Sequence, residues 1–295
     1  MMKRTYLSLS VFASMFCSHA WATDAAHVLC LNPAKADTSE LYQFIENSLG
    51  KGAVESPSDL VYTPRWPHIS LHGDADVPAY LAVLAREPGD VNLDGRSIAE
   101  GGDRSRTEIK IAPGKNGAHT AFHAHEGDNF IYAWRFKIDA AMKFSPSFSH
   151  LHQIKAYGGS YAEPPLITFT ALSNDNSDGT LEIRHVADRK NESGEYQILG
   201  RLPLSQVRGR WITVVEQIRF SNSDGRYQVS LHDQDKALLQ VDTQHLQLWR
   251  TGAEHMRPKW GIYRKHHAML NQDKDDYVYF ANIGITRGDV MAACP

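Results

Sequence analysis

The feature that most constrains the fold is a run of short segments, from about residue 104 onward, in which apolar and polar residues alternate. A period of two is typical of β-strands that turn one face toward a core. Turn signals such as Asp178-Gly179 and Asp224-Gly225 separate these segments. The expected strands cover residues 68–71, 104–111, 129–138, 151–157, 165–172, 180–186, 211–220, 227–231, 259–264 and 277–285.

A helical period is indicated at only two places, over residues 39–49 and around 243–249. Many strands joined by turns, without crossover helices, predict an all-β fold, an antiparallel β-jelly roll or concanavalin-like sandwich with a short N-terminal helix. The 295 residues are enough for a full hydrophobic core. We expect an N-terminal helical extension over 23–60 and a β-jelly-roll domain over 61–295.

The first 22 residues have the pattern of a signal peptide. Lys3 and Arg4 supply a positive region, residues 7–17 are mostly apolar, and Ala20-Trp21-Ala22 fits a small-x-small cleavage site. Cleavage after Ala22 predicts a secreted or periplasmic protein with no membrane segment in its mature form.

Two of the three cysteines, Cys30 and Cys294, remain after that cleavage. In an exported protein an even pair predicts a disulfide, which here would join the two ends of the chain. The formal net charge of −3 becomes −5 when Lys3 and Arg4 are removed. A net acidic chain is a poor candidate for nucleic-acid binding. We also expect the protein to be a monomer.

The segment 259–265 predicts a strand with two different faces. Trp260 and Ile262 share one face and point into a core, whereas Lys259, Gly261, Tyr263 and Lys265 share the other. The second face holds a phenol between two ammonium groups, and Gly261 leaves space beside it. Such a surface suits an anionic sugar.

Two further strands have the same character. One face of segment 104–111 carries four charged residues, and one face of 151–157 carries three polar ones, so a sheet containing all three strands would have a polar, mainly cationic surface. These residues are Arg104, Arg106, Glu108 and Lys110, and Gln153, Lys155 and Tyr157.

The three strands resemble, in the same order, the R-x-E, Q-x-H and K-x-G-x-Y strands of jelly-roll polysaccharide lyases. The motifs are Arg106-Thr107-Glu108, Gln153-Ile154-Lys155 and Lys259-Trp260-Gly261-Ile262-Tyr263-Arg264. The group includes heparin lyase I, the family-20 glucuronan lyases and, more distantly, the family-7 alginate lyases, and the resemblance covers roughly residues 95–287. It implies a catalytic jelly-roll domain that cleaves a 4-linked uronic-acid polysaccharide by β-elimination.

The resemblance also implies roles for individual residues. Tyr263 would act as general base and acid, Gln153 and Arg106 would neutralise the uronate carboxylate, and Lys259 completes the catalytic set. Lys259, Lys265 and Arg264 are expected to lower the pKa of Tyr263 from the usual value of about 10. The expected substrate-binding residues are Arg104, Glu108, Lys110, Lys155, Tyr157, Arg264, Lys265, His123 and His125.

One position departs from the pattern, because Lys155 stands where many relatives have histidine. Alternation turns His152 to the opposite face. Either Tyr263 performs both proton transfers or a histidine from elsewhere enters the site. The candidates are His123, His125, His266 and His267.

Three other functions stay open. A glycoside hydrolase needs two suitably spaced carboxyl groups, and Glu108 stands alone among basic residues. A non-catalytic carbohydrate-binding protein would use the same surface with aromatic side chains. An inactive lyase relative would explain Lys155. The aromatic residues in question are Tyr157, Tyr161 and Trp249.

We expect no required cofactor and no metal ligand. Some relatives hold calcium structurally, and an acidic segment near the C-terminus is where such an ion would bind. Its spacing does not match an EF-hand loop, so a solvated loop is the preferred interpretation. The residues of this segment are Asn271, Asp273, Asp275 and Asp276.

Overall fold

The computed structural model describes residues 27–61, 67–160, 162–174, 177–188, 196–270, 274–292 and 294. The α-helices are α1 (Leu41–Leu49) and α2 (Ser58–Val61), and short 3₁₀ helices cover Pro33–Lys35, Thr38–Glu40, Ile98–Glu100, Ala118–Phe122 and Leu204–Gln206. The strands are β1 (Val28–Leu31), β2 (Val54–Glu55), β3 (Ile69–His72), β4 (Tyr80–Ala85), β5 (Arg104–Lys110), β6 (Asn129–Ile138), β7 (Ser149–Tyr157), β8 (Ile167–Asn174), β9 (Ser177–His185), β10 (Gln197–Pro203), β11 (Ile212–Arg219), β12 (Gly225–Asp233), β13 (Lys236–Leu246), β14 (His255–Lys265) and β15 (Asp276–Arg287).

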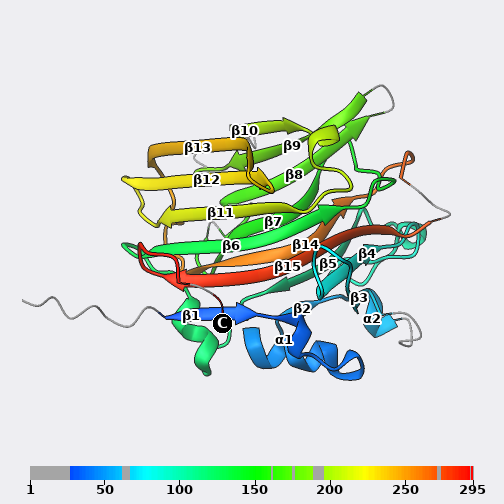
Figure 1. Ribbon diagram of the computed structural model, residues 1–295, viewed down its shortest axis with the longest axis horizontal. Helices are drawn as coiled ribbons and strands as arrows, with labels where there is room; N and C mark the ends of the chain where they lie inside the picture. Colours follow the sequence, from blue (N-terminus) through cyan, green and yellow to red (C-terminus); the bar gives the residue numbers. More distant parts are fainter. Residues whose placement is uncertain are drawn as a thin grey trace, which may run out of the picture.

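These strands form two antiparallel sheets that pack face to face (Figure 1). One has the order β13-β12-β11-β6-β15-β4-β3, with β1 also paired to β15, and the other has the order β10-β9-β8-β7-β14-β5-β2. Strands that are neighbours in the sequence often pair as hairpins. By contrast, β14 lies between β5 and β7, two strands that come far earlier in the chain. The expected antiparallel sandwich is confirmed.

Alternating side chains build the core between the sheets. Along β6, five large apolar residues at every second position are at most 1% exposed, as the sequence pattern predicts. Trp260 and Ile262 of the opposite sheet are fully buried in the same cluster. The five residues of β6 are Phe130, Tyr132, Trp134, Phe136 and Ile138.

Two local predictions are wrong. The segment 243–249 does not form a helix, because most of it continues β13, which pairs with β12 through contacts such as Val229 with Val241. Asp178-Gly179 does not form the turn but lies inside β9. In both cases pairing with a neighbouring strand overrides the local signal.

The sequence analysis also missed strands. All six residues of β4 are buried, so the strand lacks the alternation that reveals a half-exposed strand. The short strands β1 and β2 are recognisable only by their pairing with β15 and β5.

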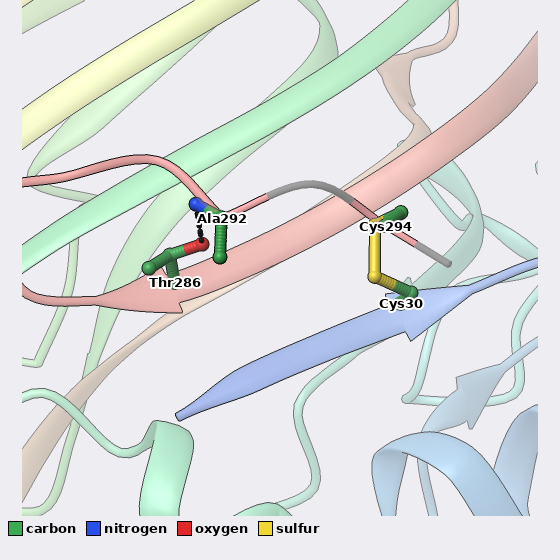
Figure 2. The surroundings of a disulfide bond; sticks show 4 residues. All are labelled: Cys30, Thr286, Ala292 and Cys294. Atoms are coloured by element: carbon green, nitrogen blue, oxygen red, sulfur yellow. Dashed lines mark hydrogen bonds between the residues drawn. A yellow bond between two sulfur atoms is a disulfide. The ribbon is translucent and has the colours of Figure 1, made fainter. Parts of the chain in front are cut away.

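The N-terminal segment is built into both sheets. β1 pairs with β15, β2 pairs with β5, and α1 buries Leu41, Ile45 and Leu49 in the shared core. The expected disulfide between Cys30 and Cys294 is present and ties β1 to the C-terminal segment (Figure 2). The expected signal peptide, residues 1–22, lies outside the described residues. Among the described residues, no helix is long and apolar enough to cross a membrane.

A buried histidine joins the N-terminal segment to the sandwich. His68 is fully buried, with Nδ1 2.5 Å from Asp59 Oδ1 and Nε2 2.7 Å from Asp90 Oδ1. Asp59 also accepts hydrogen bonds from Ser56 and Tyr42. Burial alone would lower the pKa of His68, but the two carboxylates outweigh burial and raise this pKa to about 9.

We predict that the contribution of His68 to stability depends on pH. Because the pKa is raised on folding, the contribution is fully present below about pH 6.5 and is lost as the pH rises through about 9. The shift corresponds to about 3 kcal/mol, at about 1.4 kcal/mol per unit of pKa. The measurement is the free energy of unfolding of the wild type and of His68→Gln between pH 6 and pH 10.

The matched control is His72→Gln, since His72 is exposed on the same stretch of chain. A loss of stability in His68→Gln that stays constant from pH 6 to pH 10 would contradict the assignment of a positive charge to His68.

Candidate active site

The candidate site is the face of the seven-stranded sheet that points away from the core, here called the polar face. The middle one of the three motif strands is β14, whose residues Lys259, Gly261 and Tyr263 lie opposite Lys110, Glu108 and Arg106 of β5. On its other side β14 pairs with β7, so that Gln153 lies opposite Lys259. The prediction that the three motif strands belong to one sheet is therefore confirmed.

Two carboxylates neutralise the cations at the centre of the polar face. Glu108 Oε2 lies 2.7 Å from Arg106 Nη1 and 2.8 Å from Lys259 Nζ. Glu55, from β2, forms ion pairs with Lys110, Lys259 and Arg106. Because these five side chains are almost wholly buried, the centre of the face is an ion network and not the open cationic surface that the sequence suggested.

The cations control the ionisation of Glu55. Burial alone would raise its pKa, but the positive charges of the three neighbouring cations outweigh burial and hold the pKa well below its usual range. Burial would also raise the pKa of Glu108, but the positive charges of Lys259 and Arg106 outweigh it and lower this pKa. Sequence reasoning missed Glu55, because nothing in its local sequence signals that β2 adds to the edge of β5.

Gly261 has a different role from the one expected. Gln153 on β7 donates a hydrogen bond to Glu108 on β5, although β14 lies between these strands. Glu108 lies directly opposite Gly261, which has no side chain. A Cβ there would lie 2.2 Å from the carbonyl oxygen of Thr107, and the φ of 149° also disfavours other residues. The glycine therefore serves the packing of β14 against β5 and the ion network.

Tyr263 lies at one end of this network and is partly exposed. Arg104 Nη1 donates a hydrogen bond of 2.9 Å to the phenol oxygen, and the Arg106 guanidinium lies 3.9 Å from the ring centroid. The ring of Phe148 is 5.4 Å away. The cations closest to the phenol are thus two arginines of β5.

The lysines expected beside the phenol have other partners. Lys265 Nζ lies 3.0 Å from Asp103 Oδ2, and Lys259 contacts Glu55 and Glu108. We find no contact in the described residues that supports their expected effect on Tyr263.

The prediction that Arg264 binds substrate is wrong. Arg264 is fully buried between the sheets, where Nη1 lies 2.5 Å from Asp276 Oδ2 and Nη2 lies 3.3 Å from Glu87 Oε1. Strand alternation turns it to the same side as Trp260 and Ile262. Its charge is tolerated there because two carboxylates are buried with it.

The histidines expected to enter the site do not lie beside Tyr263. His123 is buried, bonds to the carbonyl of Ala112 and stacks on His255 at 3.7 Å. His255 is eight residues from Tyr263 along β14, which corresponds to about 26 Å. His125 is exposed and contacts the carbonyl of Glu254.

The two histidines after β14 are also excluded by their positions. His266 is buried, with Nδ1 2.5 Å from Glu87 Oε2, on the side of the sheet that faces the core. His267 is exposed and accepts a hydrogen bond from the backbone of Met269.

Another histidine lies next to Tyr263. Leu151 is an extra residue of β7 in its pairing with β8, and the register with β14 shifts at the same place, so that His152 pairs with Trp260 but His150 pairs with Tyr263. The rings of His150 and Tyr263 lie 6.0 Å apart, and His150 Nδ1 is 2.8 Å from Thr170 Oγ1. Burial lowers the pKa of His150 to about 3, and the nearby Glu108 carboxylate offsets only part of this effect.

The bulge explains why the sequence analysis missed His150. Strict alternation from Gln153 would put Leu151 on the polar face and His150 in the core, whereas Leu151 is 1% exposed. A leucine out of phase in a polar series is the signal that identifies the bulge. His152 is buried against Glu216 at 2.9 Å, on the opposite face as expected.

No metal site is found in the described part of the chain, where no group of three or more His, Cys, Asp or Glu side chains can hold an ion. Asp275 and Asp276 form ion pairs with Arg86 and Arg264. Asn271, Asp273 and Tyr161 lie outside the described residues. Trp249, considered for sugar stacking, is 8% exposed and belongs to the core.

Comparison with known proteins identifies the family. The sequence matches the polysaccharide lyase family over residues 79–284, which is more than half of the chain, so the protein belongs to this family. The protein is a polysaccharide lyase, and the resemblance found in its sequence is confirmed. No curated protein sequence matches the chain.

Solved structures share the fold at low sequence identity. An alginate lyase in complex with alginate trisaccharide has a TM-score of 0.56 at 11% identity and covers 89% of this chain and 98% of its own. The marine PL-14 alginate lyase from Aplysia kurodai has a TM-score of 0.55 at 14% identity with the same coverage. A family-7 alginate lyase in complex with substrate has a TM-score of 0.51 at 11% identity and covers 81% of this chain and 89% of its own.

We predict that Glu55→Gln destabilises the protein by about 3 kcal/mol, because it removes the one carboxylate paired with Lys110 among the described residues and one of the two that contact Lys259. The matched control is Glu163→Gln, which also removes a lysine partner. Glu163 is 74% exposed, so this change should cost less than about 0.5 kcal/mol. Denaturant unfolding at pH 7 measures both. Equal stability of the two variants would show that the network does not depend on Glu55.

Proposed function

We propose that the protein cleaves a 4-linked uronic-acid polysaccharide by β-elimination, with Tyr263 as general base and then general acid. The observation that carries this proposal is the partly exposed phenol of Tyr263, which accepts a hydrogen bond from Arg104 and lies against Arg106 and His150. Alginate is the ligand in one of the structures with the same fold. The proposed substrate class is therefore a glucuronan-, heparin- or alginate-like chain.

In the proposed reaction the phenolate oxygen of Tyr263 takes the C5 proton of the uronate. The electron pair of the C5–H bond forms the C4–C5 double bond, the C4–O bond breaks, and the same phenol returns the proton to the leaving oxygen. Arg104, at 2.9 Å from the phenol oxygen, stabilises the negative charge that this oxygen carries before the first transfer and regains after the second.

The carboxylate of the reacting sugar needs a counter-charge, because removal of the C5 proton spreads negative charge onto it. Arg106 and Gln153 remain the proposed groups. Both already contact Glu108, which fixes their positions before substrate binds. Lys259, bound to the same carboxylate, holds Glu108 in place.

His150 is a poor candidate for the base despite its position. A base works best when its pKa is near the working pH, and a pKa of about 3 leaves His150 neutral and weakly basic at pH 7. Its hydrogen bond to Thr170 and its stacking on Phe148 at 4.8 Å suit a neutral ring that orients a sugar hydroxyl. We therefore assign both proton transfers to Tyr263.

We also propose that the protein is exported and acts outside the cytoplasm. The disulfide between Cys30 and Cys294 supports this, since such bonds persist in oxidising compartments.

We predict that Tyr263→Phe lowers kcat about a thousandfold or more, because it removes the only group that exchanges protons in the proposed mechanism. The measurement is the ultraviolet absorbance of the new C4–C5 double bond during incubation with polyuronates. Near wild-type activity in Tyr263→Phe would exclude the mechanism. Binding of polyuronate by the wild type without any absorbance change would favour a non-catalytic carbohydrate-binding protein.

His150→Asn should lower kcat only about tenfold, because a hydrogen-bonding group remains and the base is untouched. The matched control is His152→Asn, which alters a histidine of the same strand on the core side. Loss of activity in His150→Asn as complete as in Tyr263→Phe, in a folded protein, would transfer the role of base to His150.

A further inference from the structure

Arg257 is a buried cation that has no acidic partner among the described residues. It is 7% exposed, and its Nε atom is buried with no hydrogen-bond partner. Its Nη1 atom donates to the carbonyl of Ile111 at 3.2 Å. In the described part of the chain, all other buried lysines and arginines have a carboxylate within 4.0 Å. These paired cations are Arg106, Lys110, Arg184, Arg250, Lys259 and Arg264.

The position of Arg257 relates this unpaired charge to the candidate active site. Arg257 is two residues before Lys259 in β14, so both side chains lie on the polar face. It lies six positions before Tyr263, which corresponds to about 20 Å along the strand. A linear polysaccharide that follows β14 from Tyr263 would reach Arg257 several sugar units away.

The neighbours of Arg257 have the chemistry of a sugar-acid site. Lys155 lies directly opposite it on β7, and its one ion-pair partner in the described part of the chain is Glu163, whose side chain is 74% exposed. A partner so exposed is readily exchanged for another carboxylate. The Arg257 guanidinium lies 5.3 Å from the ring centroid of Tyr157, and this ring stacks on His255 at 5.1 Å.

The stacked rings fix the shape of this region. His255 is held between Tyr157 and His123, at ring distances of 5.1 and 3.7 Å. Burial lowers the pKa of His255 to about 3, and the nearby His123 and Arg257 act in the same direction. The ring is therefore neutral, and it leaves the positive charge of the region to Arg257 and Lys155.

We propose that Arg257, Lys155 and Tyr157 form a second uronate-binding site, remote from Tyr263, that binds a carboxylate-bearing sugar of the same polysaccharide chain. The substrate class rests on the proposed function. Arg257 and Lys155 bind the carboxylate, and the ring of Tyr157 contacts the apolar face of the sugar. The enzyme then prefers long chains and cuts them internally, because only a long chain contacts both sites.

The test uses Tyr263→Phe, which binds without turnover, and the double variant Tyr263→Phe/Arg257→Gln. The probes are a disaccharide uronate, an oligouronate long enough to span both sites, and a neutral 4-linked oligosaccharide of that length. We expect Arg257→Gln to weaken binding of the long oligouronate roughly tenfold to a hundredfold and to leave the disaccharide affinity unchanged. The matched control is Arg226→Gln, at an exposed ion pair on the other sheet.

Further variants separate charge from packing. Lys155→Gln should also weaken binding of the long oligouronate. Tyr157→Phe should keep the affinity for this probe, whereas Tyr157→Ala should lower it. Unchanged affinity of the long oligouronate in Arg257→Gln, an equal loss for all lengths, or no binding of polyuronate at all would overturn the proposal. Arg257-dependent binding without double-bond formation by the wild type would keep this site and reject only the lyase mechanism.

Discussion

The site depends on the neutralisation of buried charge. Arg106, Lys110 and Lys259 point to the same face of one sheet, and without counter-charges their burial would cost several kcal/mol each. Glu108 and Glu55 supply those counter-charges from two different strands. The network holds β2, β5 and β14 together and fixes the positions of the side chains around Tyr263.

The network also makes the N-terminal segment part of the enzyme. Glu55 belongs to β2, which lies between helices α1 and α2 in the chain. Two further connections hold the same segment, one through His68 with its two aspartates and the other through the disulfide of Cys30. A segment that looks like an extension in the sequence thus supplies a carboxylate to the centre of the site.

The fold and most of the site followed from strand alternation and motif order. Alternation correctly placed Trp260 and Ile262 in the core and Tyr263 on the polar face. His150 lies just outside the expected strand 151–157, and alternation could not have placed it, because a bulge at Leu151 changes the phase of the strand. Arg264 was wrongly predicted to bind substrate because it is charged. The alternation of the strand places it on the core side, with Trp260 and Ile262.

Long-range pairing is the part that the sequence could not supply. The contacts of Glu55 with Lys259 and of Gln153 with Glu108 join residues from different strands, and neither has a local signature. That Arg257 has no carboxylate within 4.0 Å among the described residues is likewise visible only when the partners of the other buried cations are known.

In the proposed mechanism one residue, Tyr263, both removes the C5 proton and protonates the leaving oxygen. One side chain can do both only when the C5 hydrogen and the C4 oxygen lie on the same face of the sugar ring. The most direct measurement is the rate of double-bond formation by the wild type on a polyuronate of that configuration and on its C5 epimer. We predict rapid cleavage of the first and little cleavage of the epimer. Equal or faster cleavage of the epimer would contradict the account, because it requires a second proton-transfer group on the opposite face.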